Sequence, residues 1–171
     1  LTFWATVKIG AVLVTVNTAY KIHEAEYLLR QSDTHTLVMI DSCKDSDYKA
    51  IIEELCPELK NIEPGTPLYS KTLPFLRNVI TVGFNMDGCL EWDDFVKRSQ
   101  LVPMEEVRRR ASQVRSDDVC NMQYTSGTTG FPKAILHAHR SLMHAAKVEQ
   151  NHHKQTKDDV FLCIPPLYHT G

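Results

Sequence analysis

Runs of apolar, largely β-branched residues alternate along this chain with segments that have the periodicity of amphipathic helices. We expect strands at 11–16, 36–40, 79–82, 119–124, 134–136 and 160–164. We expect helices at 22–31, 48–55, 92–99, 105–112 and 139–150. Such alternation is typical of an α/β fold, in which helices flank a largely parallel sheet.

Local signals mark the ends of several of these elements. Gly10 is placed to end a first helix, which includes 3–7, through a left-handed cap. The polar triplet 45–47 is typical of a helix start, and Pro57 ends the helix that follows. Three prolines and a glycine within 61–74 predict a surface loop.

Length and composition favour a globular protein that binds small molecules. The chain has 171 residues, of which 43% are hydrophobic, so it is long enough for one domain with a core. Its net charge is −2, so there is no basic field that would attract nucleic acid or an anionic membrane. The densest basic run, Arg108 to Arg110, is flanked by acidic residues, which indicates a solvated face.

The cysteines and the hydropathy pattern predict a soluble, cytoplasmic protein. The five cysteines are odd in number and include no Cys-x-x-Cys pair, so they are expected to be reduced and mostly buried thiols. No uninterrupted apolar run reaches the length of about 18 residues that a membrane-spanning helix needs, and no signal-peptide pattern opens the chain.

One stretch carries most of the chemical information: the ten residues from Tyr124 to Lys133. They include two glycines, four serine or threonine hydroxyls and a lysine. Glycines let backbone N–H groups approach an anion, hydroxyls donate hydrogen bonds, and lysine adds positive charge, so the stretch is interpreted as a phosphate-binding loop. Its spacing differs from that of the Walker loop, because only two residues separate Gly127 from Gly130. An ordinary polar turn between strands is the alternative.

This loop resembles the phosphate-loop signature of the adenylate-forming superfamily, which includes acyl-CoA synthetases, luciferases and peptide-synthetase adenylation domains. The resemblance continues through 133–141, into a helix start like the family's, and less completely through 165–171, where Gly171 comes one residue early. The run 10–17 is similar to an early strand of the family. Ala134 departs from the pattern, because the family usually has glycine there; a left-handed backbone at this position would cost about 1 kcal/mol.

The resemblance implies roles for particular residues. It assigns ATP-phosphate binding to Thr125, Ser126, Gly127, Thr128, Thr129, Gly130 and Lys133. Thr125 is the expected Mg²⁺ ligand, and Lys133 and His169 are the candidate catalytic residues, with His169 near the carboxylate and adenylate pocket. A histidine that only caps a strand in a proline-rich turn is the alternative for His169. His137 and His139 are not expected to form a metal pair, because alternating positions at a strand-to-helix junction point in different directions.

The resemblance also implies a domain and a reaction. We expect 1–171 to be an internal piece, cut at both ends, of the large N-terminal domain of an adenylate-forming enzyme, with its phosphate loop at 124–133. The parent enzyme is expected to activate a carboxylic acid, of medium or long chain, with ATP and Mg²⁺ and then to form the CoA thioester; the piece alone is expected to be inactive. A homodimer is possible. The alternatives are a non-catalytic nucleotide- or partner-binding module and another adenylate-former, such as an aryl-CoA ligase.

Overall fold

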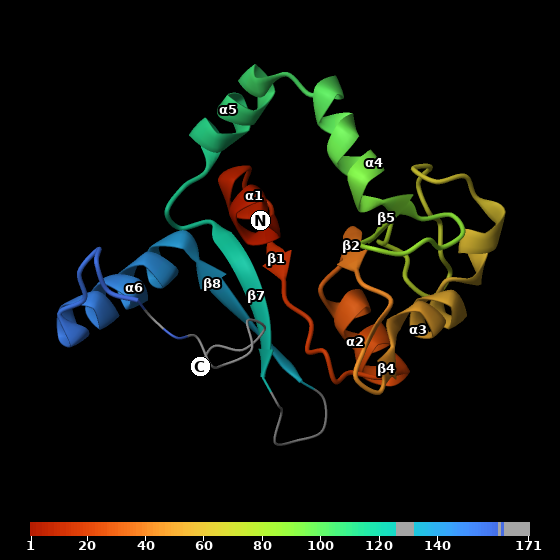
Figure 1. Ribbon diagram of the computed structural model, residues 1–171, viewed down its shortest axis with the longest axis horizontal. Coiled ribbons are helices and arrows are strands. Elements are labelled where there is room, and N and C mark those ends of the chain that lie inside the picture. Colours follow the sequence, from red (N-terminus) through yellow and green to blue (C-terminus); the bar gives the residue numbers. More distant parts are fainter. Residues whose placement is uncertain (126–131, 161, 163–171) are drawn as a thin grey trace. The chain divides into compact units, whose positions relative to one another are not determined.

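The computed structural model describes residues 1–125, 132–160 and 162, and within them the strands divide among separate sheets (Figure 1). One three-stranded sheet has the order β1-β7-β8, and another has the order β2-β5-β6. The strands of these sheets are β1 (Leu13–Val14), β2 (Thr36–Met39), β5 (Asn78–Thr81), β6 (Leu90–Glu91), β7 (Val119–Thr125) and β8 (Lys133–Ala138). The helices are α1 (Thr2–Lys8), α2 (Ile22–Gln31), α3 (Tyr48–Leu55), α4 (Trp92–Lys97), α5 (Met104–Gln113) and α6 (His139–His153), with 3-10 turns η1 (Pro57–Asn61) and η2 (Arg98–Leu101).

The chain folds as two units, which we describe separately. The first unit combines Leu1–Thr15 with Met104–Gly171, and the second comprises Val16–Pro103. The parallel pairs β1–β7, β2–β5 and β5–β6 confirm the α/β fold with parallel-rich sheets. The antiparallel pair β7–β8 lies in the first unit.

In the first unit, β7 is the central strand. The chain reaches β1 from α1 through Gly10, whose φ of 76° and the hydrogen bond from Ala11 N to Thr6 O form the predicted left-handed cap. The amide of Asn121, 2% exposed, donates from Nδ2 to the Leu13 carbonyl oxygen over 3.0 Å. This side chain therefore ties β1 to β7 in addition to the backbone ladder.

The second unit contains most of the apolar core of the described residues. Leucines from α2, α3 and the following loop pack with the middle of β5, whose Val79 and Ile80 are 3% and 2% exposed. The buried leucines are Leu28, Leu29, Leu55, Leu59, Leu68, Leu73 and Leu76. The apolar side chains of the two helices thus face one core, as their spacing in the sequence predicts.

Local signals predicted the helices well. The bounds of α2 and α3 agree with the expected ranges, and Asp47 caps α3 by accepting a hydrogen bond from the Ala50 N–H at 2.9 Å. The short hairpin of β3 (Ser42–Cys43) and β4 (Ser46–Asp47) was not predicted. Its tight turn places Lys44 at a φ of 54°.

One strand prediction was too long, and another was wrong at the residues of it that the structure describes. The first strand shrinks to two residues, since only Leu13 and Val14 pair with β7. At 160–164, the described residues Val160 and Leu162 lie in no strand and are 99% and 77% exposed. An apolar run becomes a strand only where a neighbour completes its hydrogen bonds, and neither residue has a ladder partner in the described part of the chain. None of the helices in the described part of the chain is both long enough and apolar enough to cross a membrane.

Candidate functional site

The candidate phosphate loop begins and ends on directly opposed residues of two strands. β7 and β8 pair antiparallel, and the register places Thr125 opposite Lys133. Opposed residues of an antiparallel pair have Cα atoms about 4.5–5.5 Å apart, so the two ends of the loop are held close together. The prediction that the loop joins two rigid elements is confirmed at both ends.

Thr125 and Lys133 also contact each other. The Thr125 hydroxyl donates to the Lys133 carbonyl oxygen over 3.4 Å, which leaves the lone pairs of the hydroxyl oxygen available to another partner. Lys133 is exposed, so its ammonium group is accessible to an anion. The other predicted phosphate-binding residues, 126–130, and His169 lie outside the described residues, and their roles stay predictions.

Strand β7 is held at its start by buried groups. Between Val119 and Asn121 the register shifts, so that Cys120 is the extra residue of a bulge. The Cys120 thiol donates to the His137 carbonyl oxygen over 3.4 Å, and burial raises its pKa. A thiol with a raised pKa is a poor nucleophile, so Cys120 has a packing role.

One face of the β7–β8 pair carries mostly polar side chains up to the loop, with Ile135 opposite Gln123 as its apolar member. Side chains alternate along a strand, so Asn121, Gln123 and Thr125 share a face with Lys133 and His137, which lie opposite Thr125 and Asn121. Gln123 Oε1 and His137 Nε2 are buried and have no hydrogen-bond partner within the described residues. Buried polar atoms are normally paired, so a partner other than the described residues is expected for these two.

Gln123 was not among the predicted site residues. The signal that could have found it is its position two residues before Thr125, because residues at i and i+2 of a strand share a face. His137 was considered only as half of a metal pair with His139. No group of three or more metal-binding side chains occurs in the part of the chain that the structure describes.

The helix after β8 is fixed by contacts at its first turn. The His139 N–H donates to the Asp118 carbonyl oxygen over 3.1 Å, and the Arg140 N–H donates to the Ser116 carbonyl oxygen over 2.9 Å. Arg140 Nε lies 3.1 Å from Asp117 Oδ1. These bonds join the end of β8 to the turn that precedes β7. The β7–β8 hairpin is therefore held at this end as well as at the Thr125–Lys133 pair.

Ala134 does not strain the loop exit. It lies in β8 opposite Tyr124, and it is not among the described residues with a positive φ, which are Asp33, Lys44 and Lys154 besides glycines. An extended backbone accepts a Cβ without cost. The expected penalty of about 1 kcal/mol depended on a left-handed backbone, so it does not arise.

The described part of the site suits a phosphate better than a bare metal ion. Lys133 offers a mobile positive charge and Thr125 a hydroxyl, but β7 and β8 contain no carboxylate. Mg²⁺ is usually held by one or two carboxylates together with substrate phosphates and water. The Thr125 oxygen fits as one Mg²⁺ ligand only if phosphate oxygens supply others.

Comparison with known proteins identifies the family of the chain. The family model described as AMP-binding enzyme matches residues 1–171. The provisionally named acyl-CoA synthetase YngI of Bacillus subtilis (strain 168) is 42% identical over 169 residues, which are 97% of this chain and 30% of that protein. The medium-chain acyl-CoA ligase ACSF2, mitochondrial, of Bos taurus is 34% identical over 170 residues, 96% of this chain and 28% of that protein.

A solved structure agrees with these relatives. The crystal structure of the anthranilate CoA ligase AuaEII in complex with anthranoyl-AMP is similar with a TM-score of 0.59 and 26% identity; the match covers 85% of this chain and 24% of that one. The chain thus spans less than a third of the length of the curated relatives named above. Because the family model matches every residue, from the first helix through the loop hairpin, this chain belongs to the AMP-binding enzyme family.

Proposed function

We propose that this chain is part of the large N-terminal domain of an acyl-CoA ligase and that its loop at 124–133 binds the phosphates of ATP. The main observation in support of this proposal is the register of the hairpin, which places Thr125 and Lys133 opposite each other at the two ends of the loop. An exposed ammonium group and a hydroxyl at the base of a glycine-containing loop are suited to a polyphosphate.

The proposed reaction has two displacement steps. The carboxylate of the acid attacks the α-phosphorus of ATP, pyrophosphate leaves, and the thiol of CoA then displaces AMP from the acyl-adenylate. Phosphoryl and nucleotidyl transfers depend on positioning and on charge neutralisation. Lys133 would neutralise charge on the phosphates, Thr125 would be one ligand of the Mg²⁺ that accompanies them, and His169 would lie near the carboxylate.

The names of the relatives suggest a medium-chain fatty acid as the substrate, because ACSF2 is named a medium-chain acyl-CoA ligase. An aromatic acid is the second candidate, favoured by the likeness to the anthranilate CoA ligase. Comparing octanoate with anthranilate in acid-dependent ATP–pyrophosphate exchange by the whole protein would separate the two. The 171-residue chain by itself is expected to show no such exchange.

ATP binding by the chain tests the role of the loop directly. Titration calorimetry with ATP and Mg²⁺ is expected to show saturable binding that Lys133→Ala weakens about ten- to a hundredfold, since a hydrogen bond to a charged group contributes about 1.5–3 kcal/mol. Lys147→Ala, which removes an exposed lysine of α6, serves as the control and should bind like the unmodified chain. Equal affinity of the Lys133→Ala variant and the control would refute the assignment.

A further inference from the structure

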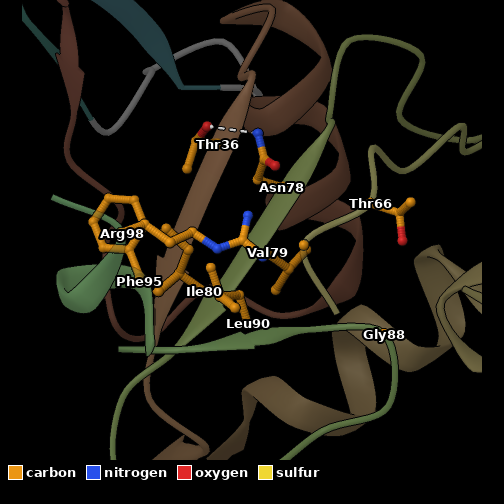
Figure 2. A pocket seen from close by; sticks show the side chains of 10 residues that line it. Thr36, Thr66, Asn78, Val79, Ile80, Gly88, Leu90, Phe95 and Arg98 are labelled. Atoms are coloured by element: carbon orange, nitrogen blue, oxygen red, sulfur yellow. Dashed lines mark hydrogen bonds between the residues drawn. The ribbon is translucent and has the colours of Figure 1, made fainter. Parts of the chain in front are cut away.

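The second unit contains a small pocket that the proposed ATP loop does not use. It has a volume of about 160 Å³ and lies where β2 and β5 begin, at Thr36 and Asn78 (Figure 2). Leu90 of β6, Phe95 of α4 and Arg98 of η2 also line the pocket. Drug-sized ligands occupy sites of about 300 Å³ or more, so this pocket suits a much smaller molecule.

The base of the pocket is apolar. Ile80 of β5 is 2% exposed, and Leu90 lies opposite it in the β5–β6 ladder, so the two share this face of the sheet, whereas the side chain of Val79 lies on the other face. Phe95 is 42% exposed and contributes its ring at the edge. A short hydrocarbon segment placed here would leave water for an apolar environment.

The rest of the lining is polar, with hydrogen-bond donors and no acid. Asn78 Nδ2 donates to Thr36 Oγ1 over 3.3 Å at the start of the two strands, as Figure 2 shows. Thr66 also lines the pocket, and its hydroxyl donates to the Glu63 carbonyl oxygen. No Asp or Glu is among the described residues that line the pocket, so nothing there repels an anion.

Arg98 gives the pocket its charge. Figure 2 shows its side chain extended across the pocket toward β5. Among the residues that the structure describes, this guanidinium makes no ion pair, and the Asp94 carboxylate of the preceding helix pairs with Lys97 at 2.7 Å instead. An arginine without a carboxylate partner can bind one from a ligand through two parallel hydrogen bonds.

Gly65 makes room for the Arg98 guanidinium. A Cβ built on Gly65 would lie 2.0 Å from Arg98 Nη2 and 2.7 Å from Cζ, and the φ of Gly65 is +87°. The positive φ favours glycine at this position, whereas the guanidinium is the end of a flexible side chain that could move away from a Cβ.

We infer that this pocket binds a short aliphatic monocarboxylate, with the carboxylate on Arg98 and the hydrocarbon tail on Ile80 and Leu90. The volume equals roughly five water molecules at about 30 Å³ each, which suits a chain of about four carbons. The site is built entirely from the second unit, whereas the residues proposed to bind ATP belong to the first.

Titration of the 171-residue chain with butyrate, in the absence of ATP, tests the inference. Two-dimensional ¹H–¹⁵N NMR is expected to show saturable shifts at the amides of Thr66 and 78–80, with a Kd on the order of 1–10 mM for so small a ligand. Arg98→Gln should weaken binding at least about tenfold, and Arg98→Lys should be intermediate, because lysine keeps the charge but loses the bidentate geometry. Arg108→Gln, on an exposed arginine of α5, is the matched control.

Butyramide separates charge recognition from simple filling of the cavity. It has nearly the shape of butyrate without its charge, so it should bind at least about tenfold more weakly. Equal binding of butyrate and butyramide would overturn the inference, as would unchanged affinity in Arg98→Gln or shifts confined to β7 and β8. The proposed ATP site would survive any of these results, because it is measured separately with ATP and Lys133→Ala.

Discussion

Replacing Asn121 with alanine should loosen the strand that leads to the phosphate loop. Asn121 is 2% exposed, and its Nδ2 donates over 3.0 Å to the Leu13 carbonyl oxygen. β1 has only two residues in register with β7, so this bond is a large part of what joins the two strands. The substitution removes the donor and leaves a void where the amide was.

Two contributions set the size of the effect on the free energy of unfolding. A lost neutral hydrogen bond costs about 0.5–1.5 kcal/mol. The void from deleting a buried side-chain amide adds about 1–2 kcal/mol, less than the 2–5 kcal/mol of a leucine-to-alanine change because fewer atoms are removed. The expected loss is about 2–3 kcal/mol, a substantial share of the 5–15 kcal/mol typical of a whole domain.

Urea unfolding, followed by far-UV circular dichroism, measures this loss. Asn151→Ala, at an exposed position of α6, is the control and should change stability by less than about 0.5 kcal/mol. Hydrogen exchange at Thr15, whose N–H donates to the Met122 carbonyl oxygen, should accelerate only in Asn121→Ala. Equal stability of the two variants would show that the amide does not hold β1 to β7.

Three further predictions concern other described residues. Gly88→Ala should lower the free energy of unfolding in urea by about 3 kcal/mol or more, since the new Cβ would lie 2.2 Å from a backbone oxygen at a φ of +70°. Gly83→Ala has a φ of +80° but open space around the Cβ, so it should lower that free energy by only about 1 kcal/mol. Burial raises the pKa of Cys89 from 9.0 to about 12, so the free energy of unfolding should fall by about 1.4 kcal/mol per pH unit as pH rises through that interval. Cys89→Ala should lack this pH-dependent loss. Hydrogen bonds, first from Arg109, lower the pKa of Glu106 to about 2, and Arg109→Gln should raise the NMR titration midpoint.

Each of these predictions has a result that contradicts it. Equal losses in the two glycine variants would mean that the backbone conformation alone sets the cost. A pH profile of Cys89→Ala parallel to that of the unmodified chain between pH 9 and 12 would show that this thiol is not protected from ionisation. If the NMR titration midpoint of Glu106 is unchanged in Arg109→Gln, the ion pair with Arg109 is not the cause of the low pKa.

Elements governed by near neighbours in the chain could be predicted closely. The periodic apolar residues and end signals of α2 and α3 lie within the helices themselves, because helix hydrogen bonds join residues four apart. The left-handed cap at Gly10 is local for the same reason. The glycines, hydroxyls and lysine of the candidate loop also lie in one continuous stretch, so their composition alone indicated phosphate binding.

Features that depend on distant partners were missed or misjudged. The short β1 and the absence of a strand at Val160 depend on which backbone is available for pairing. The hairpin 42–47 is an exception, because its pairs are local and it was missed all the same. Gln123 was overlooked because its burial and its place on the face of Thr125, Lys133 and His137 follow only from the pairing of β7 with β8. The concern over Ala134 disappeared for a similar reason, since its φ is set by the ladder with β7.

The sequence by itself determined the α/β class, the helices and the loop between Tyr124 and Lys133, together with the family that the loop resembles. Only the tertiary structure decided that Thr125 and Lys133 lie opposite each other, that Gln123 and His137 share their face, and that Arg98 reaches into a pocket beside Gly65. The physical reason is the range of the interactions involved. Helix periodicity, caps and loop composition are set by residues a few positions apart, whereas strand register and pockets arise from pairing and packing across tens of residues.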